Sequence, residues 1–391
     1  MPALPYWRLS AVYLAYFACV GVLQPYLGLY LQSLGQGAAE LGALVAAMQL
    51  ARIVSTNGWA WLADRARHRE WVLRAAAVAS LVAWLPMFVA RDFLALGLVL
   101  AAASFAMGGV VPLTEAIVLA RLRDQVSRYG RLRIWGSLGF IVAVLCAGWA
   151  FDRVPIGVLP VLTCIALLAV VVAAYAVPPA PQLRPAQHER VLPMLRRPEI
   201  AAFLVSAFLL QVAHGPLYTF LSIYLADFGY SPSFIGAMWS LGVAAEIVAF
   251  LLMPRLLARF GTGPVLLASF ALAAIRFALI GWGVASAPLV VVAQLLHGAT
   301  FGAHHAAAVA VTARWFAGAR QARGQAAYLS VSFGAGGMVG GLASGLLWDS
   351  VGAAWTFGSG SAAALLGLAV LAANRAARGA APPSPIGTGM G

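Results

Sequence analysis

The sequence contains no lysine, and charged residues of all kinds make up only 9% of its 391 positions. A soluble domain has about 25% charged residues and about 45–50% apolar ones, whereas 62% of this chain is hydrophobic. This composition excludes an ordinary soluble protein. It indicates a multi-pass protein of a cell membrane, with room for about twelve spans of roughly 20 residues. We expect the inner membrane of a bacterium.

Cysteine is also scarce, and the motifs of common enzymes are missing. Cys19, Cys146 and Cys164 lie in apolar runs without disulfide or metal-ligand spacing, so we expect small buried side chains. We find no nucleotide-binding loop, no metal-ligand cluster and no Ser/His/Asp set in a suitable context. These absences disfavour ATP-driven pumping and hydrolysis. We expect no enzymatic activity, no cofactor and no bound metal.

The net charge of +13 comes from arginines that are concentrated in alternate loops. Basic loops remain on the cytoplasmic side of a membrane, so this distribution orients the chain and does not indicate a nucleic-acid partner. Only Arg91 and Arg153 fall in loops that we expect outside. Both termini are therefore predicted to be cytoplasmic.

The apolar segments form two groups, within 1–177 and within 199–375. Between them, 178–198 is rich in proline and arginine and is predicted to be a cytoplasmic linker. The Gly- and Pro-rich end, 376–391, is predicted to be a disordered tail. The expected fold is all-α, with twelve transmembrane helices in two six-helix halves around a central cavity. We expect a monomer in the lipid bilayer.

Three ionisable residues of the first half fall inside predicted spans, where a charge costs about 2.5–3.5 kcal/mol on insertion scales. Glu115 and Arg133 lie on neighbouring helices and should meet each other or a ligand. Arg52 has no acid in its own helix. It either pairs with Glu115 or holds an anion, ideally a carboxylate bound through two hydrogen bonds.

The second half begins with a polar stripe on an apolar helix. Gln211, His214 and Tyr218 follow each other at helical spacing, so they share one face. Such a face contacts protein or water and not lipid. The stripe is expected to line the cavity, where it would bind substrate, or to make interhelical hydrogen bonds.

A second polar group of this half has features of a proton site. Glu246 lies about two turns from Trp239 on one helix face, and helix rise places Arg276 at a similar depth. A Glu246–Arg276 ion pair either opens when a proton replaces the arginine or is a fixed structural bridge. His297 and His304 share one side of a later helix. A proton or substrate role and simple packing both remain open for them.

Two six-helix halves joined by a linker resemble the major facilitator superfamily, whose halves rock around a midplane site. A marker of that superfamily is the loop Gly-x-Leu-Ala-Asp-Arg-x-Gly-Arg-Arg. Its Leu-Ala-Asp-Arg core is present at 62–65, although both glycines are replaced. The resemblance implies that Asp64 and Arg65 act in a loop that controls the conformational change.

Four further segments resemble the phenylpropionate permease branch, which is related to lactose permease and to nucleoside–proton symporters. They are PLTE at 112–115, YGRLRIWGS at 129–137, WSLGVAAE at 239–246 and LHGATF at 296–301. In the lactose-permease relatives, a glutamate and an arginine of the first half bind substrate. These two residues match Glu115 and Arg133.

The same relatives couple protons through acids, an arginine and a histidine of the second half. The matching positions are Glu246, Arg276 and His297. The acid that follows the histidine in the sugar permease is replaced at about Thr300. Coupling would then depend on Glu246 with histidines, or be absent.

These features together predict proton-coupled symport of a small organic solute. The surplus of arginines and the aromatic Tyr16, Trp135, Tyr218 and Trp239 suit an aromatic or other small carboxylic acid, as does the resemblance. Sugar or nucleoside uptake and drug efflux are the alternatives within the same class. A membrane sensor or binding protein that no longer moves solute is the alternative from another class.

Overall fold

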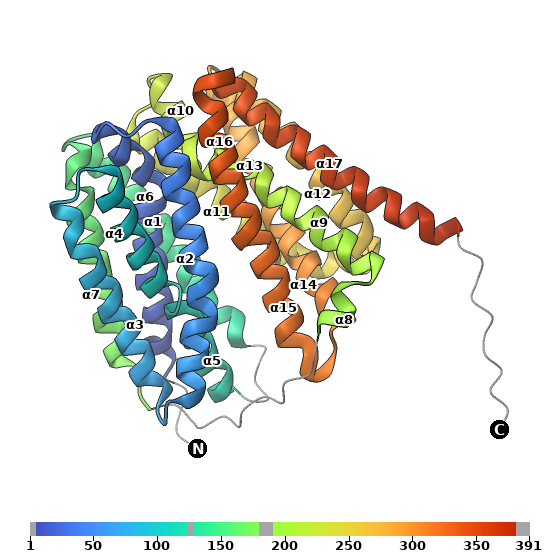
Figure 1. Cartoon of the computed structure of the whole chain (residues 1–391), viewed down its shortest axis with the longest axis horizontal. Coiled ribbons are helices and arrows are strands. Elements are labelled where there is room, and N and C mark those ends of the chain that lie inside the picture. The colour runs from blue at the N-terminus through green and yellow to red at the C-terminus, as the bar shows by residue number, and fades with distance from the viewer. Residues whose placement is uncertain (1–4, 123–127, 180–190, 381–391) are drawn as a thin grey trace.

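The structure is a computed structural model that describes residues 5–122, 128–179 and 191–380. Its described part is helical and contains no β-strand. Two groups of helices, α1–α7 and α8–α17, lie side by side (Figure 1). The centre of the predicted linker, 180–190, is outside the described residues, as is 381–391 of the predicted tail.

In its described residues, the first group is built from seven α-helices and two short 3-10 turns. In chain order they are α1 (Tyr6–Ser33), α2 (Ala38–Arg65), α3 (Arg69–Trp84), η1 (Leu85–Phe88), α4 (Phe93–Met107), α5 (Val110–Leu122), α6 (Tyr129–Phe151), η3 (Ile156–Val158) and α7 (Leu159–Ala176). The helices α4 and α5 together form one crossing.

The second group has more interruptions. Its elements are α8 (Leu192–Leu195), α9 (Pro198–Ala213), α10 (Gly215–Asp227), α11 (Pro232–Phe260), α12 (Thr262–Gly283), α13 (Ala287–Leu295), η4 (Gly298–Ala303), α14 (His304–Trp315), η5 (Gly318–Arg320), α15 (Gln321–Leu329), η6 (Ser330–Gly336), α16 (Gly337–Val351) and α17 (Ala353–Ala380). Both η4 and η6 are π-helical turns. The helix α17 includes 376–380, the first residues of the predicted tail.

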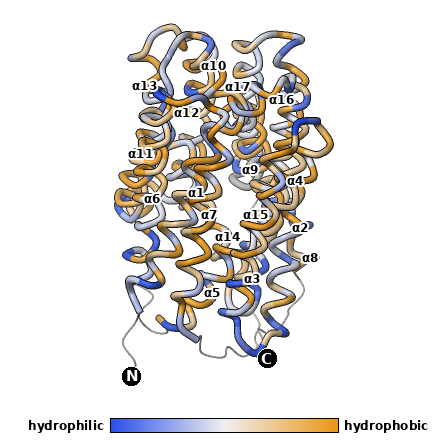
Figure 2. Tube along the Cα trace, turned by 90° about the vertical axis from the view of Figure 1, so that its left-hand side faces the viewer, coloured by the Kyte–Doolittle hydropathy of each residue, from blue (hydrophilic) through white to orange (hydrophobic). Residues whose placement is uncertain are grey.

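Eleven helical stretches of the described chain are long and apolar enough to cross a membrane. The remaining expected crossing, 288–314, consists of α13, η4 and α14, and a turn at Leu296 interrupts it, which leaves no single helix of sufficient length. Hydrophobic residues follow the lengths of the helices, and hydrophilic ones gather near their ends (Figure 2). The predicted all-α membrane fold is confirmed.

Several crossings break near their middle. Between α4 and α5, a Cβ atom at Gly108 would lie 2.5 Å from Ser55 Oγ, and one at Gly109 would lie 2.4 Å from the Trp59 ring. Only glycine permits this close approach to α2. Between α9 and α10 the chain turns at His214. Broken helices leave backbone polar groups inside the protein, where they are available to a site.

The two groups of helices are closest near α10 and α16 and diverge toward α5 and α15 (Figure 1). We call the diverging end the arginine-rich end, because the helices that end there carry Arg65, Arg121, Arg259 and Arg314 in their last turns. The described polar contacts between the groups lie at the opposite end or near mid-length. The structure is therefore closed at the end opposite the arginines.

Glycine contacts close that end. A Cβ atom at Gly42 of α2 would lie 2.8 Å from the Cα atom of Gly345 in α16, so the two backbones touch. A Cβ atom at Gly236 of α11 would lie 2.7 Å from the carbonyl oxygen of Val144 in α6. Small residues of this kind let membrane helices approach closely.

Polar contacts reinforce the same closure. The Asp152 carboxylate accepts hydrogen bonds from the Ser233 N–H at 3.1 Å and from the Ser233 hydroxyl. Tyr26 Oη lies 3.1 Å from the carbonyl oxygen of Val144 and 3.2 Å from that of Pro232, which belong to different groups. Backbone packing and these hydrogen bonds thus seal one end together.

Candidate functional site

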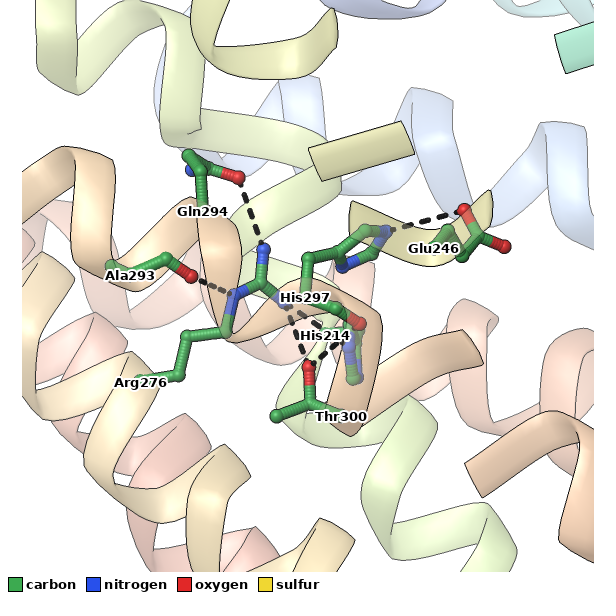
Figure 3. Close-up of polar contacts among 7 residues, drawn as sticks. All are labelled: His214, Glu246, Arg276, Ala293, Gln294, His297 and Thr300. Carbon is green, nitrogen blue, oxygen red and sulfur yellow. Dashed lines mark hydrogen bonds and ion pairs between the residues drawn. The ribbon is translucent and has the colours of Figure 1, made fainter. Parts of the chain in front are cut away.

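Arg276 of α12 is the centre of a buried polar cluster in the second group, and its side chain has no exposed surface. Its Nε donates to the carbonyl oxygen of Ala293 at 2.9 Å, and its Nη2 donates to Gln294 Oε1 at 3.3 Å (Figure 3). Its Nη1 donates to Thr300 Oγ1 at 3.3 Å. Ala293 lies in the last turn of α13, where carbonyl groups lack an intrahelical partner. The break in this crossing therefore supplies an acceptor for the guanidinium.

The hypothesised ion pair between Glu246 and Arg276 is not formed in this structure. Glu246 Oε2 instead lies 3.8 Å from His297 Nε2. The His297 ring lies between the carboxylate and the guanidinium (Figure 3). Arg276 is turned toward the neutral acceptors of α13 and η4, so its charge reaches Glu246 only across the imidazole. The Glu246 carboxylate and the Arg276 guanidinium are thus separated by an imidazole, which can itself carry a proton.

His214 is a neutral partner of Arg276. Its Nδ1 lies 2.8 Å from the carbonyl oxygen of Leu210, which can only accept, so we assign the proton to Nδ1. Its Nε2 then presents a lone pair to Arg276 Nη1 at 3.5 Å. The side chain is fully buried. Of the two expectations for this residue, the structure places it in interhelical contact and not on an open cavity surface.

The other two residues of the polar stripe have different surroundings: Gln211 packs against a neighbouring helix, and Tyr218 forms part of an aromatic wall. Gln211 is buried, and its Cβ would lie 2.9 Å from a Cβ atom at Gly336, so it packs against η6. The Tyr218 ring stacks beside Trp239 with a centroid separation of 6.2 Å. Trp239 is held in place because its Nε1 donates to Ser222 Oγ at 3.0 Å.

His304 is buried but lies apart from this cluster. Among the described residues, neither of its ring nitrogens has a hydrogen-bond partner. Its ring meets Phe270 edge to face at 5.3 Å. The structure gives it no bond to Glu246, Arg276 or His297, so it is not brought into the predicted proton group. In the described part of the chain, no three His, Cys, Asp or Glu residues are placed to hold a metal ion.

The first group contributes Glu115 and Arg133, which do not pair with each other. Glu115 Oε1 accepts a hydrogen bond from Tyr129 Oη at 2.8 Å. The Arg133 guanidinium lies 4.2 Å from the ring centroid of Phe17 and is one of two positive charges within electrostatic range of Glu246. The cation is thus supported by an aromatic face, not neutralised by a carboxylate.

Arg52 likewise has no ion-pair partner among the described residues, so the proposed pairing with Glu115 is absent. Its Nη1 donates to Gln49 Oε1 at 3.3 Å. Gln49 Nε2 in turn donates to the carbonyl oxygen of Phe333 in η6 at 3.3 Å. Arg52 is therefore positioned by a residue that bridges the two groups of helices.

The predicted control loop lies at the arginine-rich end. Asp64 forms an ion pair with Arg69 at 3.1 Å. The Arg65 guanidinium lies 4.0 Å from the ring centroid of Trp61 in the same helix. These contacts stay within the first group of helices, as expected where the two groups diverge.

Sequence reasoning missed several residues of the site. Gln294 and Thr300 hold Arg276, and Tyr129 holds Glu115. Gln294 had a usable signal, because an amide in an apolar span needs a partner. Phe17, beneath Arg133, had none, because it is one apolar residue in an apolar helix. Trp135 was expected in the cavity, but its Nε1 donates to Tyr6 Oη at 2.9 Å at the start of α1.

Two groups of membrane-crossing helices, closed at one end and containing a buried guanidinium that is bound by a carbonyl group at a helix end, are typical of a transporter of the major facilitator type. Residues 6–359 match the MFS_1 like family, and the chain belongs to that family. It is therefore a multi-pass membrane protein of a transporter family, and the predicted superfamily is confirmed.

Known relatives agree with this assignment. The chain is 28% identical over 333 residues to the probable 3-phenylpropionic acid transporter of Escherichia coli (strain K12), which covers 83% of this chain and 86% of that protein. It is 27% identical over 271 residues to maltose permease of Geobacillus stearothermophilus, which covers 68% of each. The crystal structure of nucleoside transporter NupG superposes with a TM-score of 0.78 at 20% identity, over 95% of this chain and 98% of that one.

Proposed function

We propose that this transporter carries a small carboxylic acid, best an aromatic one, by symport with protons. The observation that supports it is the charge balance between the two groups of helices. The spans hold Arg52, Arg133 and Arg276 together with Glu115 and Glu246, and among the described residues none of these arginines forms an ion pair with an acid. One positive charge is left over in a low-dielectric site, and a substrate carboxylate would balance it.

Aromatic surfaces favour an aromatic acid over an aliphatic one. Phe17 lies beneath the Arg133 guanidinium, and Tyr218 and Trp239 form a wall beside Glu246 on the other side. A carboxylate at Arg133 would leave its apolar end between these rings. A relative named as a probable 3-phenylpropionic acid transporter supports the same substrate class.

The proton is proposed to bind at Glu246 and His297. Their side chains retain 17% and 10% exposure, so they can exchange protons while Arg276 stays fully buried. The hydrogen bonds of Arg276 to Ala293, Gln294 and Thr300 do not involve Glu246, so a change in its charge would leave them in place. It would therefore act as a fixed positive charge beside a carboxylate that changes protonation.

The orientation of the chain in the membrane is proposed from its charge distribution. Basic segments remain cytoplasmic, so we assign the arginine-rich end to the cytoplasm, together with both termini. The structure would then be the state that is open inward. Inward proton flow could drive uptake of the acid, with Asp64 and Arg65 acting in the loop that controls the transition.

The test uses purified protein in liposomes that contain a pH dye. External 3-phenylpropionate should acidify the interior faster than in protein-free liposomes, which control for passive entry of the weak acid. Glu246→Gln should abolish this difference but retain counterflow of labelled acid. Acidification driven only by a sugar or a nucleoside would refute the proposed substrate. Binding without counterflow would identify a sensor and refute transport.

A further inference from the structure

A lateral groove runs between α1 and α7, away from the site between the two groups of helices. It has a volume of about 560 Å³. Small residues line it, including Ala11 and Ala15 of α1 and Ala169 and Ala173 of α7. Both helices are long and apolar enough to cross a membrane, and they pack side by side (Figure 2). An apolar groove on the outside of such a pair is filled by lipid chains.

The groove ends near an arginine that no described residue neutralises. Arg8 precedes Ala11 by three positions and Ala15 by seven, so it lies on the same face of α1. It is exposed, and it has no hydrogen-bond or ion-pair partner in the described part of the chain. Trp7 beside it is 68% exposed, as is typical of a side chain at the membrane interface.

A second arginine, Arg74, contacts the end of α7, but its guanidinium already has partners within the protein. Arg74 Nη2 donates to the carbonyl oxygen of Val177 at 3.0 Å, and its guanidinium lies 5.3 Å from the ring centroid of Tyr175. It therefore satisfies the end of α7. Arg8 differs because it is exposed, has no partner among the described residues and lies on the face of α1 that lines the groove.

We propose that this groove is a binding site for one anionic phospholipid. An acyl chain lies along Ala169 and Ala173, and the phosphate is bound by Arg8 at the arginine-rich end. Apolar packing along the groove would not distinguish one lipid from another. The charge of Arg8 would, because it favours a lipid with an anionic headgroup. Only the choice of leaflet rests on the proposed orientation of the transporter. With that orientation the lipid lies in the cytoplasmic leaflet, where anionic lipids attract basic residues.

The experiment counts phospholipids bound to the purified full-length protein by native mass spectrometry. Phosphatidylglycerol should give one tightly bound copy, and phosphatidylcholine should not. Arg8→Gln should weaken this binding about fivefold, and Arg8→Lys should largely retain it. Ala169→Leu fills the groove from an exposed position and should also remove the bound lipid.

Arg255→Gln is the matched control, because Arg255 is an exposed arginine in the last two turns of α11, in the other group of helices. It should bind phosphatidylglycerol like the unmodified protein. Equal binding in Arg8→Gln and Arg255→Gln would overturn the proposal, as would equal binding of phosphatidylcholine. Because the readout is lipid binding, it stands or fails independently of the transported substrate.

Discussion

Substitution of Gly42 by alanine should shift the transporter away from the closed arrangement at the end opposite the arginines. The new Cβ atom would lie 2.6 Å from the carbonyl oxygen of Gly341 and 2.8 Å from the Cα atom of Gly345. Both are backbone atoms, so no side chain can rotate away and α2 must separate from α16. Overpacking of this kind costs about 1–3 kcal/mol, which corresponds to about 5- to 150-fold in the ratio of closed to open states.

The same helix provides the matched control. A Cβ atom at Gly58 would meet only the Phe105 ring, at 3.5 Å, which is an ordinary contact. Gly58→Ala should therefore leave the equilibrium unchanged. Gly345→Ala should act like Gly42→Ala, and the double variant should show less than the sum, because both changes break one contact.

The assay is a distance distribution between spin labels at Ser33 and Ser350, in a background without native cysteines. These residues end α1 and α16 near the closed end, one in each group of helices. Gly42→Ala should increase the population with the longer distance. An unchanged distribution in Gly42→Ala, or an equal change in Gly58→Ala, would refute the steric argument.

Three further variants test the charged residues. Arg133→Ala should weaken carboxylate binding about tenfold to a hundredfold, because a hydrogen bond to a charged group is worth about 1.5–3 kcal/mol; binding of the neutral amide analogue, measured by calorimetry, should change little. In Glu246→Gln, counterflow of labelled substrate should become independent of pH between about 5 and 8, because the amide cannot take up the proton, and persisting pH dependence would assign the proton elsewhere. Tyr129→Phe leaves Glu115 without its donor and should lower the free energy of unfolding by about 1.5 kcal/mol, measured by denaturation in mixed micelles, whereas Tyr175→Phe on the lipid-facing side should not.

The membrane-crossing helices could be predicted from the sequence because the bilayer demands long apolar segments with internally satisfied backbones. The candidate site could be predicted only as a set of residues. Counting residues along a helix gives depth, and Glu246 and Arg276 are at comparable depth. It does not give the rotation of each helix or the local breaks, and these decide which atoms meet.

Arg276 illustrates the limit. Its main acceptor is the backbone carbonyl of Ala293, which is available because α13 ends two residues later. A π-helical turn has no clear pattern in one sequence, so this acceptor could not be foreseen. Arg276 consequently does not pair with Glu246, the expected acid, and His297 lies beside Glu246 instead.

The hydroxyl of Tyr26 has a consequence for how easily the closed end opens. It has one proton but two acceptors within reach, the carbonyl oxygen of Val144 and that of Pro232. If α11 moves away, the proton stays with Val144 in the same half, and the Pro232 carbonyl still has its place in the first turn of α11. The Tyr26 hydroxyl therefore keeps a hydrogen-bond acceptor when the two groups of helices separate. This contact can be broken and remade in every transport cycle without the cost of an unpaired buried donor.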